Sequence, residues 1–134
     1  MFDSLDISAS ALLAQRARMD TISQNVANTY TLRGENGEKE PYRRRFVVLA
    51  AGQGSDAAAP GVHVQSVQLD PSAFRKVYDP GHPDADADGN VLYPNVDLAI
   101  EQVNMIGASR AYEANITMME TTKAMINASM RLIA

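Results

Sequence analysis

The sequence predicts an α+β fold, mainly α, with long N- and C-terminal helices paired as an antiparallel coiled coil and a small β-rich insert between them. Apolar residues recur every seven positions near both ends of the 134-residue chain, which is the spacing of a helix seam. All six prolines, and every glycine except Gly107, lie between these ends. We therefore expect residues 1–28 and 96–134 to form a helical core, and 29–95 to form a β-rich insert with an acidic, turn-rich connector.

The first helix is predicted from about Ser4 to Asn28, a stretch without proline or glycine. Its seven-residue series consists of Leu5, Leu12, Met19 and Val26. Three further residues, Ala9, Leu13 and Ile22, should widen the same stripe. Asp3 or Ser4 is expected to cap the helix start, because a side-chain oxygen can accept hydrogen bonds from the unpaired N–H groups of a first turn.

The second helix is predicted from about Val96 to the C-terminus, a length of roughly 36 residues and 54 Å. Its series is unbroken and consists of Leu98, Met105, Tyr112, Met119, Ile126 and Ile133. Four further residues, Val103, Ile106, Ile116 and Met130, should broaden this face. Asn95 or Asp97 is expected to cap the helix, with Glu101 near its positive end. Gly107 is expected to mark a close helix approach or a bend.

Short β segments are predicted within the insert. The stretch YRRRFVVLA at 42–50 is typical of a strand. The stretch VHVQSVQL at 62–69 alternates and then shifts phase between Val64 and Val67, which predicts a β-bulge. AFRKVYD at 73–79 is a third, shorter candidate, whereas 34–41 and 52–61 are predicted to be polar or low-complexity connections. We expect a thin sheet or hairpin unit that projects from the helices.

The acidic stretch at 84–89 has two interpretations. Asp84, Asp86, Asp88 and Gly89 follow the opening of a calcium-binding loop, so a calcium-responsive binding protein is the alternative function. The twelfth position, however, is Asn95, which cannot provide two carboxylate oxygens, and prolines flank the segment. The favoured interpretation is a tight turn in which Asp side chains bond nearby backbone N–H groups and Gly89 adopts a positive φ.

Composition and motifs argue against most other functions. The chain has no cysteine, so disulfides and thiol catalysis are excluded, and its net charge of −4 argues against nucleic acid. No apolar run is long enough to span a membrane, and no cleavable secretion signal is visible. His63 and His82 have no spacing typical of a metal site or catalytic triad, and no phosphate loop or nucleophile motif is present. We predict no enzyme activity and no cofactor.

Polar residues on the predicted helices favour contacts between subunits. The faces opposite the stripes carry Ser, Thr, Asn and Gln, and few charges occur after Asn115. Such faces suit helices that neighbouring subunits cover, although they could also decorate the surface of a monomer. The basic cluster Arg43, Arg44 and Arg45 is a second candidate contact, with a charged, solvated strand edge as the alternative.

Several stretches resemble the flagellar axial proteins of bacteria. ALLAQRARMDTISQNVANTYT resembles their N-terminal signature, with Asn25 and Asn28 in its centre, and SRAYEANITMMETTKAMINASMRLI, which contains Asn115, resembles their C-terminal helix. PYRRRFVVL and above all VYDPGHPDADADGNVLYPNVD are similar to the C-type proximal rod proteins of the basal body. On this resemblance we add Asn25, Asn28 and Asn115 to the candidate subunit contacts.

The resemblance implies a structural subunit of the periplasmic flagellar rod that packs helically and transmits torque from motor to hook. It implies export by the flagellar type III apparatus without a cleaved signal. Expected partners are copies of the same chain, other rod subunits, rod-base adaptor proteins and membrane-ring proteins. The paired terminal helices would form the inner core of the tube, and the acidic stretch would be a shaped connector.

Overall fold

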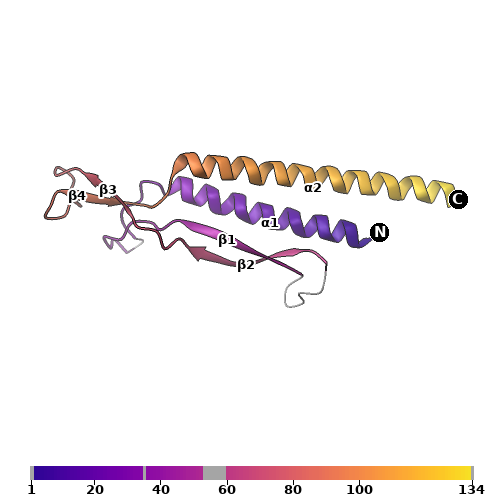
Figure 1. Ribbon diagram of the computed structural model, residues 1–134, viewed down its shortest axis with the longest axis horizontal. Coiled ribbons are helices and arrows are strands. Elements are labelled where there is room, and N and C mark those ends of the chain that lie inside the picture. Colours follow the sequence, from indigo (N-terminus) through magenta and orange to yellow (C-terminus); the bar gives the residue numbers. More distant parts are fainter. Residues whose placement is uncertain (1, 35, 53–59, 134) are drawn as a thin grey trace.

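The computed structural model describes residues 2–34, 36–52 and 60–133 (Figure 1). Over this part of the chain the order of elements is helix, four strands, helix. Their bounds are α1 Phe2–Ala27, β1 Arg45–Ala51, β2 Val62–Leu69, β3 Arg75–Tyr78, β4 Asn90–Tyr93 and α2 Leu98–Ile133. The predicted fold class is therefore confirmed. The predicted low-complexity connection at 52–61 falls mostly on 53–59, outside the described residues.

The two helices lie side by side and run in opposite directions, so that both chain ends are at the same end of the molecule (Figure 1). Helix α1 has 26 residues and α2 has 36. At 1.5 Å per residue these lengths are about 39 and 54 Å. The C-terminal part of α2 therefore extends beyond the start of α1, without a partner helix inside the chain.

Helix α2 turns a narrower face toward α1 than the sequence predicted. Met105, Tyr112, Met119 and Ile126 are half-buried, as expected for the seven-residue series, whereas Leu98 is 38% exposed and the side chain of Ile133 is outside the described part. A second series, of small and polar residues, is buried or half-buried: Glu101, Ala108, Asn115, Thr122 and Ser129. The predicted broadening by Val103, Ile106, Ile116 and Met130 is wrong, because all four side chains are exposed. The seam lies on the small-residue side, where fully buried Ala108 lets the helices approach closely.

Helix α1 is covered on two sides, by α2 and by the β1–β2 hairpin. Leu5, Leu12 and Met19 are half-buried, and Ala14 and Ile22 are buried. Val26 and Leu13 are exposed, so the predicted widening at Leu13 is wrong. The helix begins at Phe2, which places the predicted caps Asp3 and Ser4 within its first turn.

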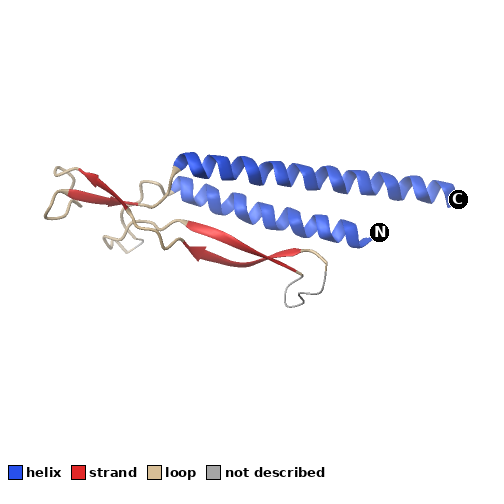
Figure 2. Ribbon diagram, in the orientation of Figure 1, coloured by secondary structure: helices blue, strands red, loops and turns tan. Residues whose placement is uncertain are grey.

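The strands form two separate antiparallel hairpins among the described residues (Figure 2). In the β1–β2 hairpin, Val48 pairs with Ser66 and Leu49 pairs with Val64, so Gln65 is the extra residue of a bulge. This confirms the bulge predicted from the phase shift. The third predicted strand corresponds to β3, which pairs with β4 from Arg75 opposite Tyr93 to Tyr78 opposite Asn90. The sequence analysis had assigned β4 to the acidic connector and missed it.

Only one of the two hairpins projects from the helices. The β3–β4 hairpin extends beyond the helix pair, as predicted for the whole insert, but β1–β2 runs back alongside α1 (Figure 1). Three hydrogen bonds to α1 hold this hairpin: the Val62 amide donates to Ser10 Oγ at 3.1 Å, and the Asn25 side chain bonds both the carbonyl and the amide of Arg45 at the start of β1. The expected projection is therefore wrong for β1–β2. Across the described residues, neither helix has an apolar stretch that would span a membrane.

Candidate structural site at the helix and hairpin junction

The last turns of α1, the first turn of α2 and the start of β1 meet at Asn25, whose side chain is completely buried. Its Nδ2 donates to the Arg45 carbonyl at 2.7 Å and to Glu101 Oε2 at 3.1 Å. Its Oδ1 accepts from the Arg45 amide at 2.9 Å and from the Tyr42 hydroxyl at 3.0 Å. Because the amide bonds both backbone groups of Arg45, it acts like a peptide group of a neighbouring strand. Asn25 thus fixes the start of β1 against α1.

Glu101 connects the second helix to the same point. Its carboxylate is completely buried, and it accepts from Asn25 through one oxygen and from Arg44 Nε at 2.7 Å through the other. A buried carboxylate requires this pairing, because leaving it without partners would cost several kcal/mol. Burial lowers the pKa of the Arg44 guanidinium, but the hydrogen bonds and charges of Glu101 and Asp70 outweigh burial and raise that pKa above its ordinary value.

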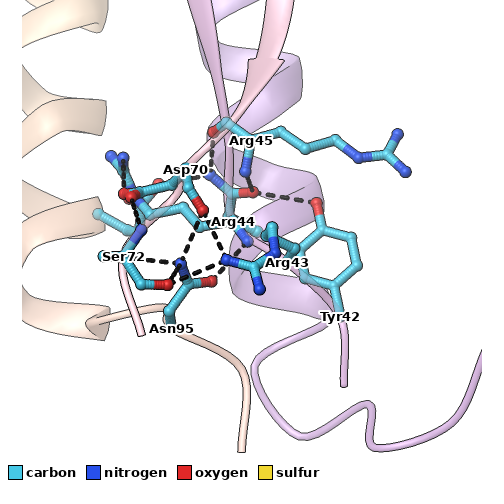
Figure 3. Close-up of polar contacts among 9 residues, drawn as sticks. Tyr42, Arg43, Arg44, Arg45, Asp70, Ser72 and Asn95 are labelled. Atoms are coloured by element: carbon cyan, nitrogen blue, oxygen red, sulfur yellow. Dashed lines mark hydrogen bonds and ion pairs between the residues drawn. The ribbon is translucent and has the colours of Figure 1, made fainter. Parts of the chain in front are cut away.

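The segment between the two hairpins is held by Asp70, Ser72 and Asn95. Arg44 Nη1 donates to Asp70 Oδ2 at 3.2 Å, and the Arg44 amide donates to Asn95 Oδ1 at 2.8 Å (Figure 3). Asn95 Nδ2 donates to Ser72 Oγ at 2.9 Å. The Ser72 amide donates to Asp70 Oδ1, and this bond, with the weaker help of Arg44, holds the pKa of the Asp70 carboxyl below its ordinary value.

Arg43 also binds the segment between the two hairpins. Its Nη1 donates to the carbonyls of Asp70 and Ser72 at 2.9 and 3.0 Å, and its guanidinium lies 4.3 Å from the centre of the Phe74 ring. The guanidinium groups of Arg43 and Arg44 therefore bind groups within the same chain. We call the set Asn25, Tyr42, Arg43, Arg44, Asp70, Ser72, Asn95 and Glu101, with the backbone of Arg45, the junction network.

The predicted subunit contacts differ in how much surface they present. Asn25 presents none in this conformation, because it is completely buried and its amide is fully used. Asn28 and Asn115 are half-buried and bond carbonyls of their own helices, at Gln24 and Ala111. Of the three consecutive arginines, only Arg45 is exposed.

The acidic stretch is a turn between β3 and β4. Asp86 Oδ1 accepts from the amides of Asp88 and Asn90 at 2.9 and 2.8 Å, and Gly89 has a φ of 77°. These features confirm the predicted turn. Asp84 is paired with Arg33, whose Nη2 lies 2.6 Å from Asp84 Oδ1, and this hydrogen bond lowers the pKa of the Asp84 carboxyl.

No finding supports the calcium-responsive alternative. Within the described ranges, no three His, Cys, Asp or Glu side chains are grouped so that they could hold a metal ion. The two histidines take part in local bonds: His63 Nδ1 lies 3.1 Å from the Gly52 carbonyl, and His82 Nδ1 accepts from the Asp84 amide. Every buried polar side-chain atom in the described part of the chain has a hydrogen-bond partner.

Comparison with known proteins agrees with this architecture. A family profile described as "Flagella basal body rod protein" matches residues 5–31, and one described as "Flagellar basal body rod FlgEFG protein C-terminal" matches 87–132. The flagellar basal-body rod protein FlgC of Bacillus subtilis is 46% identical over 139 residues, covering 93% of both chains. The chain belongs to the FlgC family of flagellar basal-body rod proteins. FlgC of Borreliella burgdorferi is 37% identical, covering 99% of this chain and 97% of its own, and FlgC of Salmonella typhimurium is 40% identical, covering 94% and 92%.

Membership of the FlgC family confirms the predicted resemblance. The two matched segments meet in the junction network, since 5–31 contains Asn25 and 87–132 contains Asn95 and Glu101. The sequence analysis missed the pairing of Asn25 with Glu101 and predicted Glu101 only as a charge near a helix start. Glu101 lies four positions before Met105, on the face of α2 that forms the seam. A charged residue on a seam indicates that it has a buried partner, and this was the signal in the sequence.

Proposed function

We propose that this chain is a structural, non-enzymatic subunit of the flagellar rod that assembles helically and transmits torque from motor to hook. The junction network is the observation that carries the mechanical part of the proposal. Both helices, both hairpins and the segment between them converge on it. A force applied to a hairpin reaches the helices through many hydrogen bonds and ion pairs, so no single bond carries the load.

The outer faces of the helices support assembly. On α2, large apolar side chains are exposed well outside the seam, including Val103 at 69%, Met125 at 64% and Leu132 at 89%. Exposed apolar area of this kind is stabilised when a partner covers it, by about 25 cal/mol for each Å² removed from water. We propose that neighbouring subunits cover these faces, so that residues 1–28 and 96–134 form the inner core of the tube. Asn28, Asn115 and Arg45 remain our candidate contacts.

The finer assignment of partners and location follows from the family. We propose contacts with copies of the same chain, other rod subunits, rod-base adaptor proteins and membrane-ring proteins, in the periplasmic part of the basal body. The chain would reach this place through the flagellar type III export apparatus, without a cleaved signal. Following the chain in a strain without that apparatus tests the route: we expect it to stay in the cytoplasm, and normal delivery would contradict the proposal.

The free subunit should order further when it assembles. The end of α2 extends beyond α1 (Figure 1) and its side chains are mostly exposed, so few contacts inside the chain can offset its conformational entropy. We expect circular dichroism to show helix content rising when purified rod partners are added. A free chain that is already fully helical and melts sharply would contradict this expectation.

A further inference from the structure

A cavity of about 280 Å³ lies where α1, β1 and the start of α2 meet. Charged residues from three elements line it: Arg18 from α1, Arg45 and its neighbour Arg44 at the start of β1, and Glu101 from α2. Asn104 adds a polar side chain from α2. The lining of this cavity has a net positive charge, since it contains three arginines and one carboxylate.

The single carboxylate is already neutralised. Glu101 Oε1 lies 2.7 Å from Arg44 Nε, and both groups belong to the junction network. Among the described residues, Arg18 donates only to the neutral side chain of Gln15, at 3.3 Å. The Arg45 side chain extends away from Arg44 and Asp70 (Figure 3), and its guanidinium lies 5.7 Å from the centre of the Tyr42 ring. No carboxylate of the described residues lies within ion-pair distance of Arg18 or Arg45.

With Glu101 paired to Arg44, the lining of this cavity keeps the positive charge of Arg18 and Arg45, which a carboxylate from outside the chain would neutralise. A guanidinium presents a planar set of donors that matches a carboxylate, and a partly enclosed site makes such a pair stronger than one in open water. The Glu101–Arg44 pair in the cavity lining is held in place by the junction network. The cavity is therefore suited to an acidic side chain carried on a projecting segment of a neighbour.

The chain itself carries a segment of that kind. Asp79, Asp86 and Asp88 lie at the tip of the β3–β4 hairpin, which extends beyond the helix pair (Figure 2). Within the described residues none of the three has a cationic partner, whereas nearby Asp84 forms ion pairs with Arg33 and Lys39. Asp86 uses one carboxylate oxygen in the turn, and the Asp88 carboxylate has no hydrogen bond to any part of the chain that the structure describes.

We propose that the Arg18–Arg45 cavity binds the acidic β3–β4 tip of a second copy of this chain. This inference rests on the proposed function, because it names one of the contacts by which copies assemble. The two surfaces are different parts of the molecule, so the contact is head-to-tail and extends into an open helical array. Arg45 is then the arginine of the cluster that contacts a neighbour, whereas Arg43 and Arg44 act within the subunit.

A charge exchange within one chain tests the proposal. In a strain lacking the native gene, we would express the wild type, Arg45→Glu, Asp88→Lys and the double variant, and measure the amount of each in isolated basal bodies. Like charges facing each other at a contact cost several kcal/mol, so each single variant should fall at least about tenfold. In the double variant every contact between copies regains an opposite pair, and incorporation should return to near the wild-type level.

Arg16→Glu is the matched control, because Arg16 is exposed on the same helix as Arg18 and does not line the cavity. Its incorporation should stay near that of the wild type. Equal incorporation of Arg45→Glu and Arg16→Glu would overturn the inference. So would failure of the double variant to recover, because the carboxylate would then come from another rod protein. Absence of the wild type from basal bodies would instead contradict the proposed function itself.

Discussion

Replacing Asn25 by alanine should be one of the most damaging single changes in the chain. The substitution removes four hydrogen bonds inside the junction network. Three of them, to Arg45 and Tyr42, are at partly exposed groups that water can reach, so each loss should cost about 1 kcal/mol. The fourth is to the completely buried Glu101 carboxylate and should cost about 1.5–3 kcal/mol.

The expected loss is therefore about 4–6 kcal/mol in the free energy of unfolding. A domain of ordinary stability has about 5–15 kcal/mol in total, so the variant should lose about a quarter of its stability or more. Urea unfolding followed by far-ultraviolet circular dichroism measures this as a lower midpoint at unchanged slope. Tyr42→Phe removes one of the four bonds and should lose only about 1 kcal/mol.

Asn28→Ala is the matched control on the same helix. Asn28 is half-buried and bonds only nearby groups, the Gln24 carbonyl and the Thr31 hydroxyl, so its loss should cost less than about 1 kcal/mol. The reasoning would be refuted if Asn25→Ala and Asn28→Ala unfolded at the same urea concentration. Such a result would mean that the network positions side chains without contributing to stability.

Four further predictions each concern a single position. Gly89→Ala should destabilise the chain by about 1–2 kcal/mol, because φ is 77° and the added Cβ would lie 3.0 Å from the Tyr78 ring. Gly107→Ala should instead stabilise the chain by about 1 kcal/mol, because no described atom would lie within 4 Å of the added Cβ and alanine favours the helix. Thermal melts measure both changes. Asp97→Ala removes the bonds from Asp97 Oδ1 to the amides of Ala99 and Ile100 and should cost about 1 kcal/mol in urea unfolding, as loss of a helix cap does; an unchanged midpoint would contradict the capping role. Because the folded-state pKa of Asp70 lies below its ordinary value of 3.8, its contribution to stability is present above that pH and is lost as pH falls through the lowered pKa. Asp70→Asn should be less stable than the wild type at neutral pH and should show a smaller loss on acidification, and an identical acid dependence would contradict this assignment.

The absence of a close neighbour at Gly107 excludes one of the two roles predicted for this glycine, the close helix approach, and leaves the bend as a prediction. Nothing within the described chain lies within 4 Å of the Cβ that an alanine would add there, so the glycine does not mark a close approach of α1. The close approach occurs one residue later, at the completely buried Ala108. A glycine leaves room for a second helix to approach closely, but only the position of that helix decides whether the close approach occurs there.

The sequence by itself determined the features that depend on near neighbours in the chain. A seven-residue apolar period predicted two helices, the phase shift between Val64 and Val67 predicted the bulge at Gln65, and Asp and Gly spacing predicted the turn at 84–89. The same local patterns carried the family resemblance. Each of these features is decided within a few residues by backbone sterics, hydrogen-bond geometry and side-chain spacing.

Only the tertiary structure decided which residues meet across the fold. It placed the β1–β2 hairpin against α1, paired β4 with β3, and directed Arg43 and Arg44 inward while leaving Arg45 exposed. Asn25 and Glu101 are 76 residues apart, yet one hydrogen bond joins them. Heptad patterns allow the helices several registers and leave the hairpins free to pack elsewhere. The buried carboxylate and amide remove that freedom, because one arrangement gives all of their polar atoms partners.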